Sequence, residues 1–172
     1  NKKDSTGICF IGERPFPEFV GSYLSGEEGN IINENDDVIG IHQGLVFYTL
    51  GQRQGLGIGG VQGLPDLPWY VAKKNLKTNE LLCVQGNDHP LLFSTELSTK
   101  NLFKLDDSLP ISFEGTAKVR YRQEDQKCEI NVEDNTLNIK FHKPQRSVTP
   151  GQSVVIYKND KCLGGGEICT IN

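Results

Sequence analysis

The chain has 172 residues, of which 36% are hydrophobic and 23% charged, and this composition is typical of a soluble protein with one medium or two small domains. Its net charge of −4 excludes a chain that is basic throughout. No apolar run is long enough to predict a membrane span. The first residues lack the apolar region of a secretory signal, and free thiols favour a reducing compartment, so we expect a cytoplasmic protein.

The N-terminal segment, residues 1–20, contains a short apolar patch around Cys9 and then the pattern of a helix. Apolar residues recur at the i, i+3, i+4, i+7 and i+8 spacing of one helical face. We therefore predict a cysteine-bearing loop joined to a short helix. The residues in this stripe are Phe16, Phe19, Val20, Tyr23 and Leu24.

The remainder of the chain predicts strands, so we expect a mainly β protein. The polar run 33–37 lies between apolar segments and predicts a hairpin. Segments 69–72 and 81–84 predict a second strand pair, and residues 46–50 are rich in strand-forming residues. The polar and turn-forming residues at 86–90 predict a domain boundary, which divides the chain into a central domain over 21–90 and a C-terminal domain over 91–172. Short strands recur throughout the latter, and this spacing predicts a sandwich or barrel.

A basic row is predicted in the C-terminal domain, where residues 117–122 alternate between an apolar and a basic face. Lys118, Arg120 and Arg122 share one face and can neutralise RNA phosphates, although a solvated outer strand face is an equally ordinary interpretation. Tyr121 belongs to the core or, if the strand ends there, to a stacking surface for a base. Charge is consistent with this placement, because residues 115–172 carry 9 Lys and Arg against 7 Asp and Glu, whereas residues 1–114 carry 9 against 15.

The glycine-rich segment 51–60 invites comparison with phosphate-binding loops. It lacks the Gly-Lys-Ser/Thr ending of a P-loop and does not open a helix in a βαβ unit, so neither nucleotide motif is present. Gln52 and Arg53 remain candidates for contact with RNA phosphates. The alternative is a loop that is mobile or packed closely on another backbone.

Cysteines and histidines are the other candidates for chemistry. They lack the paired spacings of zinc sites, so we predict no metal. Cys83, Cys128 and Cys162 lie in β patterns and are interpreted as packing residues. We interpret His42 and His89 as structural.

Cys9 is the strongest nucleophile candidate, because a reactive thiolate requires exposure and nearby positive charge. Glycines flank it, and three cations lie within the first fourteen residues. Judged by its neighbours alone, it is more typical of a small buried hydrophobic residue.

Ordered blocks along the whole chain resemble the bacterial tRNA-specific 2-thiouridylases. The first block, residues 4–14, is similar to the second cysteine motif of that family. The others follow in the family's order: His42-Gln43-Gly44, Tyr48-Thr49-Leu50-Gly51-Gln52-Arg53, Gly55-Leu56-Gly57-Ile58-Gly59-Gly60, Pro68-Trp69-Tyr70-Val71, Arg120-Tyr121-Arg122-Gln123, Thr149-Pro150-Gly151-Gln152 and Cys162-Leu163-Gly164-Gly165-Gly166.

The resemblance implies a sulfurtransferase that thiolates the wobble uridine of tRNA at C2. ATP adenylates the C2 oxygen, and sulfur relayed as a persulfide from a cysteine desulfurase displaces AMP. Cys9 matches the cysteine that carries the persulfide or resolves it as a disulfide with a second cysteine. Arg120, Tyr121 and Gln152 match positions that contact tRNA.

The resemblance also implies the fold: a small central β-barrel-like (SH3-like) domain followed by a C-terminal β-barrel like those of translation factors. The family's ATP-binding domain, with its phosphate loop and first catalytic cysteine, has no match in these residues. We therefore expect a C-terminal half that does not itself bind ATP and is inactive alone. Two alternatives stay open: a stand-alone RNA-binding barrel without catalysis, and an unrelated thiol enzyme that uses Cys9 with His42.

Overall fold

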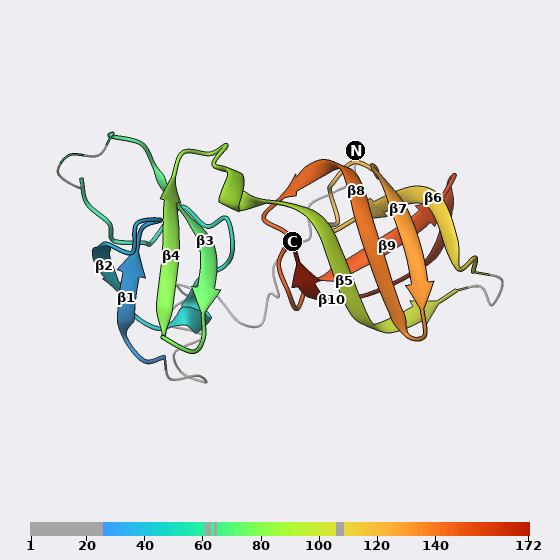
Figure 1. Ribbon diagram of the computed structural model, residues 1–172, viewed down its shortest axis with the longest axis horizontal. Helices are drawn as coiled ribbons and strands as arrows, with labels where there is room; N and C mark the ends of the chain where they lie inside the picture. The colour runs from blue at the N-terminus through green and yellow to red at the C-terminus, as the bar shows by residue number, and fades with distance from the viewer. Residues whose placement is uncertain (1–25, 61–62, 64, 106–108) are drawn as a thin grey trace, which may run out of the picture. The chain divides into compact units, whose positions relative to one another are not determined.

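The computed structural model describes residues 26–60, 63, 65–105 and 109–172. The predicted cysteine loop and short helix therefore lie outside the described residues. The chain divides into two compact units between Leu92 and Phe93, and each is described by itself (Figure 1). Within the described part of the chain, no helix is long and apolar enough to span a membrane.

The first unit contains a four-stranded sheet in the order β2-β1-β4-β3. Strand β1 pairs antiparallel with β2 and parallel with β4, and β3 completes the sheet antiparallel to β4. Both predicted strand pairs are confirmed. The elements of this unit are β1 (Gly29–Ile32), β2 (Val38–His42), the 3-10 helix η1 (Leu45–Phe47), β3 (Trp69–Asn75), β4 (Glu80–Gln85) and the 3-10 helix η2 (Pro90–Leu92).

The β1–β2 turn is organised by one side chain. The Oδ1 atom of Asn33 accepts hydrogen bonds from the backbone N–H groups of Asn35 and Asp37, both at 2.9 Å. Asp36 adopts a φ of 63°, a left-handed conformation that Asp tolerates better than most residues. The polar run between the strands thus encodes the hairpin directly.

Residues 46–50 do not form a strand, although they are rich in strand-forming residues. Leu45 and Tyr48, three residues apart, are both buried in the core of this unit. A 3-10 turn brings residues at i and i+3 to the same side, whereas a strand directs them to opposite faces. Burial of this pair therefore favours η1 over the strand suggested by propensity.

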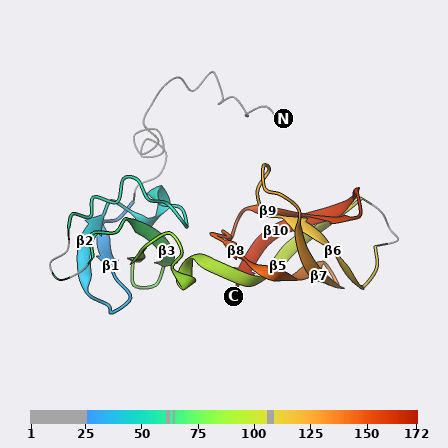
Figure 2. The ribbon, with the colours of Figure 1, turned by 90° about the horizontal axis from the view of Figure 1, so that it is seen from above.

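The second unit is a closed barrel in the order β10-β5-β8-β7-β6-β9. Figure 2 shows β9 and β10 on one side of the barrel and β5, β8 and β7 on the other. All six strand pairs are antiparallel, and the predicted mainly β fold with a C-terminal barrel is confirmed. The strands are β5 (Phe93–Lys104), β6 (Ser112–Lys118), β7 (Gln126–Glu133), β8 (Thr136–Arg146), β9 (Ser153–Lys158) and β10 (Lys161–Ile171).

The barrel interior follows the alternation of the sequence. Cys128 and Ile130 point inward from β7 and are fully buried, whereas Glu129 between them is exposed. The inward positions of neighbouring strands complete a single apolar cluster. Its fully buried members include Ala117, Leu137, Val154, Ile156 and Ile168.

The glycine triplet 164–166 allows the barrel to close. A Cβ atom at Gly164 would lie 2.2 Å from the carbonyl oxygen of Phe103, and Gly164 adopts a φ of 148°. Any side chain there would push β10 away from β5, because atoms approach this closely only by overlapping. The close approach of β10 to β5 thus explains why glycine occupies this position in the block that resembles one in the thiouridylase family.

Candidate nucleic-acid interface

The predicted basic strand face is wrong, because β6 ends at Lys118 and residues 119–125 form a loop that leads to β7. Gln123 closes this loop. Its Oε1 atom accepts a hydrogen bond from the Val119 N–H at 2.9 Å, and its own N–H donates to the Arg120 carbonyl at 3.1 Å. These contacts turn the backbone, so the three basic residues do not share a strand face.

Lys118 is engaged within the barrel. Its Nζ atom lies 3.1 Å from the Asp125 carboxylate and 5.7 Å from the centre of the Tyr157 ring, and its side chain is only 20% exposed. A paired, half-buried cation offers little net charge to a phosphate. Lys118 therefore holds the base of the 119–125 loop.

Arg120 joins this loop to the turn that follows β8. Its Nη2 atom donates to the Ser147 carbonyl at 3.2 Å, and the Thr149 hydroxyl donates to the same oxygen at 3.0 Å. The Gln152 N–H in turn donates to the Thr149 carbonyl at 3.2 Å. Because β6 and β8 end, and β7 and β9 begin, at the same end of the barrel, Arg120 and Gln152 belong to one surface although 32 residues separate them in the chain.

Tyr121 lies in the same loop and is 69% exposed. Of the two interpretations drawn from the sequence, the core position is wrong, because the strand ends before this residue. Arg122 beside it is also exposed. An exposed ring between two basic residues is the composition of a surface that stacks bases and neutralises phosphates.

Sequence reasoning missed a buried glutamine at this end of the barrel. Gln145 is 5% exposed and hydrogen-bonds through its side chain to Gln123 and Gln126. On β8, Leu137, Ile139 and Phe141 alternate inward, but the exposed Lys143 interrupts this alternation before Gln145, so periodicity did not mark the glutamine as buried.

Arg53 lies in the first unit, on the wall of a pocket of about 770 Å³. Gln52 stabilises this loop, because its Oε1 atom accepts from the Thr49 N–H and its Nε2 atom donates to the Gln54 carbonyl, both at 2.9 Å. Its amide is thus committed within the chain, whereas Arg53 is exposed. The rest of the pocket wall is formed by residues 55–60, 65–69 and Gln85.

The glycines of this pocket are not packed against another backbone. Among the described residues, a Cβ atom at Gly57, Gly59 or Gly60 would meet nothing within 4 Å. The close-packing interpretation of the 51–60 segment is therefore wrong at these positions. Only Gly57 among the three requires glycine for its conformation, with a φ of 65°.

His42 is a structural residue, as expected. It is fully buried, its Nδ1 atom accepts from the Gly44 N–H at 3.0 Å, and its Nε2 atom lies 3.0 Å from the Asn79 carbonyl. This arrangement requires the neutral Nε2–H tautomer and leaves neither nitrogen available as a base. The alternative of a thiol enzyme with His42 as its base is thereby excluded. The Nε2 atom of His89 lies 3.2 Å from the Glu34 carboxylate.

The described thiols include two that are chemically inert. Burial raises the pKa of Cys83 and of Cys128 to about 12, so both are protonated at neutral pH. Cys162 is half-buried and Cys169 exposed, and all four are free thiols. Cys9, the predicted catalytic residue, lies outside the described residues.

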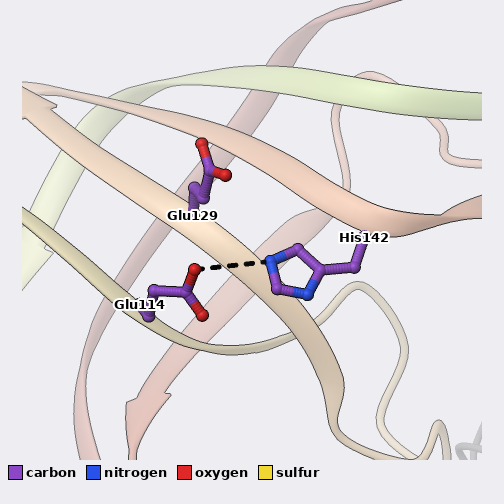
Figure 3. Close-up of side chains that lie close together, drawn as sticks. All are labelled: Glu114, Glu129 and His142. Carbon is purple, nitrogen blue, oxygen red and sulfur yellow. Dashed lines mark ion pairs between the residues drawn. The ribbon is translucent and has the colours of Figure 1, made fainter.

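A cluster of possible metal ligands lies on the outer surface of the barrel. Glu114, Glu129 and His142 come from β6, β7 and β8, and their ligand atoms lie within 4.8 Å of one another (Figure 3). His142 Nε2 is 3.8 Å from Glu114 Oε1. Sequence spacing cannot reveal a group that three strands bring together. All three side chains are exposed to water, as are many surface charge clusters, and we assign no ion to them.

Two family models match the chain, one in each unit. The model described as the tRNA methyl transferase PRC-barrel domain matches residues 17–85, and the one described as the aminomethyltransferase beta-barrel domain matches residues 94–168. The fold and these matches define a protein with two β domains, the first similar to the PRC-barrel domain of tRNA methyl transferases and the second to the β-barrel domain of aminomethyltransferases.

Curated relatives make the family specific. Proteins named tRNA-specific 2-thiouridylase MnmA are 56% identical in Francisella tularensis strains WY96-3418 and LVS, and 55% identical in strain U112, each over 170 residues. The alignments cover 98% of this chain and 47% of each relative. The chain belongs to the tRNA-specific 2-thiouridylase family and corresponds to the C-terminal part of its members. It spans about half the length of the curated relatives it matches.

Proposed function

We propose that this chain is the C-terminal part of a tRNA 2-thiouridylase and supplies surfaces that bind tRNA. The observation that carries the proposal is the convergence of Arg120, Tyr121 and Gln152 at one end of the barrel. They come from two loops, and hydrogen bonds through Ser147 and Thr149 link Arg120 to the Gln152 backbone. A basic and aromatic surface of this kind suits a folded RNA.

The proposed reaction replaces the C2 oxygen of the wobble uridine with sulfur. ATP adenylates that oxygen, so that AMP departs when a persulfide sulfur attacks C2. The persulfide comes from a cysteine desulfurase through a relay protein, in the reducing cytoplasm. Glycine loop 51–60 lacks the lysine of a phosphate-binding loop, so we assign ATP to the N-terminal domain of the whole protein.

Cys9 is proposed as a catalytic residue, within the N-terminal segment 1–20 that lies outside the described residues. It either carries the persulfide or attacks the persulfide of a second cysteine. In either case the thiolate of the other cysteine displaces the terminal sulfur, which is transferred to C2, and the two cysteines form a disulfide that an external dithiol must then reduce. Both roles require a thiolate at residue 9, which a serine hydroxyl cannot replace.

Each unit is proposed to contribute its own contacts to tRNA. Arg120, Tyr121, Arg122 and Gln152 act in the barrel, with Lys118 supporting the loop. Arg53 acts in the first unit, where its pocket is open to solvent and its charge is exposed.

Binding is tested with the 172-residue chain and unmodified tRNA, followed by fluorescence anisotropy over a series of salt concentrations. We expect binding that weakens steeply as salt rises, because phosphate contacts release counterions. A chain that does not bind tRNA even at low salt would overturn the proposed RNA-binding role.

Catalysis is tested in a chimera in which this chain replaces the matching C-terminal part of a Francisella relative. We expect the chimera to thiolate tRNA with ATP and a persulfide donor, and Cys9→Ser to abolish thiolation while leaving tRNA affinity unchanged. Cys169→Ser is the matched control and should remain active. Equal activity of Cys9→Ser and the parent chimera would remove Cys9 from the mechanism. A chimera that binds tRNA but never thiolates it would favour the stand-alone RNA-binding module.

A further inference from the structure

We propose that Gln145 is a positioning residue that fixes the 119–125 loop in the conformation that presents Arg120 and Tyr121 to RNA. This inference rests on the proposed function, which assigns RNA contacts to the loop. It concerns a residue with no contact role of its own, since Gln145 is almost entirely buried.

Every polar group of the Gln145 side chain is used. Its Nε2 atom donates to the Lys143 carbonyl at 2.7 Å and to Gln126 Oε1 at 3.2 Å. Its Oε1 atom accepts from Gln123 Nε2 at 2.7 Å. A buried amide is costly unless it is satisfied in this way, and its partners must keep their places for it to remain so.

Gln123 transmits this constraint to the loop backbone. Its Oε1 atom accepts from the Val119 N–H, and its own N–H donates to the Arg120 carbonyl. Gln123 thus bonds to Val119 through its side chain and to Arg120 through its backbone, on both sides of the peptide bond that joins these two residues. Gln126, the other partner, reaches the loop as well, because its Nε2 atom donates to the Glu124 carbonyl at 3.0 Å.

The Arg120 side chain is held by the turn that directly follows β8. Its guanidinium bonds to the carbonyl of Ser147, two residues after Gln145. Residues 145–147 therefore restrain both the backbone and the side chain of Arg120. Restraint before binding reduces the ordering cost that a flexible loop pays on contact with RNA, and this increases affinity without a new contact.

A neutral amide suits this task better than a charged group. A carboxylate at position 145 would attract the Arg120 guanidinium inward and repel phosphates, and an ammonium would lack the acceptor that Gln123 requires. The network thus positions the arginine while leaving its charge available.

The test compares variants of the 172-residue chain. Gln145→Met keeps the side-chain volume and removes all three hydrogen bonds. Gln123→Ala removes the hydrogen bond between Gln123 and Gln145 by changing the partner in the loop. Because Gln123 is only half-buried, this change provides a second variant if Gln145→Met fails to fold. The matched control is Thr99→Val, which removes a buried hydrogen bond to the Leu137 N–H elsewhere in the same barrel.

Three quantities are measured: tRNA affinity by anisotropy, thermal stability, and amide hydrogen exchange at Val119. We expect both glutamine variants to bind tRNA about tenfold more weakly, because the loop must then be ordered on binding, and to lose protection at the Val119 N–H. Thr99→Val should lower thermal stability to a similar degree while retaining parental affinity and Val119 protection.

A purely structural role predicts another pattern. Parental tRNA affinity in folded Gln145→Met, or an equal loss of affinity in Thr99→Val, would overturn the positioning role. Unchanged Val119 protection would overturn it as well, whatever the affinity. If the parent chain itself fails to bind tRNA, the proposed function fails, whereas the Val119 exchange data still decide whether Gln145 holds the loop.

Discussion

The guanidinium of Arg120 donates a hydrogen bond from Nη2 to the carbonyl oxygen of Ser147 at 3.2 Å. This contact joins the loop after β6 to the turn after β8 at the end of the barrel where both strands finish. Only part of the five-donor guanidinium is used by this bond, so the group can be positioned by the protein and still engage a phosphate.

Arg120→Ala should weaken tRNA binding by about tenfold at low salt and reduce the slope of log affinity against log salt by about 1. Arg120→Lys should keep the slope but lose part of the affinity, because an ammonium cannot bind a phosphate through two parallel N–H groups as a guanidinium can. Anisotropy titrations at several salt concentrations measure both quantities.

Lys118→Met is the control for charge alone. Its ammonium is already paired with Asp125, so its removal should change the salt slope less than removal of Arg120. Equal slopes for the two variants would show that the pairing seen here does not neutralise Lys118 in solution.

Tyr121→Ala should weaken tRNA binding by about tenfold, because a stacked base loses its aromatic partner. Tyr121→Phe keeps the ring and removes only the hydroxyl, so its affinity should stay within about twofold of the parent. The same titrations apply, with circular dichroism to establish that the barrel is intact. If Tyr121→Phe loses as much affinity as Tyr121→Ala, the hydroxyl and not the ring makes the contact.

The two buried thiols predict alkaline loss of stability. The pKa of Cys83 and of Cys128 is about 12 in the folded chain and about 9 when exposed. Their protonated forms are favoured by folding, so their contribution is complete below pH 9 and is lost as the pH rises from 9 toward 12. Urea midpoints should therefore decrease over that range.

Each thiol can be removed without a large change in volume. Cys128→Val should flatten the pH dependence of barrel unfolding, and Cys83→Val should do so for the first unit. In the folded chain at pH 8, iodoacetamide should label Cys169 and spare both buried thiols. Rapid labelling of Cys128 under native conditions would contradict its burial.

Gly164→Ala should destabilise the barrel by about 2 kcal/mol or more, since the added methyl group would lie 2.2 Å from the Phe103 carbonyl oxygen. Gly151→Ala separates conformational strain from overlap. This residue has a φ of 87° but open space around its Cβ position, so about 1 kcal/mol is expected. Urea unfolding measures both, and a smaller effect for Gly164→Ala than for Gly151→Ala would show that β10 can move aside.

Hairpins and barrel strands were predictable because their signals are local. The run 33–37 carries the Asn and Asp residues that a tight turn needs, and β7 and β8 alternate inward and outward with a period of two. The strand-forming residues of segment 46–50 are also a local signal, and there the signal was misleading. Its strand propensity is a property of single residues, whereas η1 forms because Leu45 and Tyr48 are buried together.

The residues predicted to contact RNA illustrate the limit of pattern reading. Alternation placed Lys118, Arg120 and Arg122 on one strand face, but the strand ends at Lys118, where the next N–H, that of Val119, donates to the Gln123 side chain. The amide at 145 was overlooked because nothing near it in the chain explains a polar residue at an inward position. Its partners Gln123 and Gln126 are about 20 residues away in sequence.

By itself, the sequence determined the mainly β class, the turns, the inward-facing apolar positions and, through its ordered blocks, the family. These depend on periodicity, backbone preferences and residue identity, which are all readable along the chain. Only the tertiary structure decided which charges are already paired, which histidine has both nitrogens occupied, and which loops meet at the end of the barrel. Those properties depend on distances between residues that are far apart in the chain, and the packing of the first unit's sheet and the closure of the barrel set these distances.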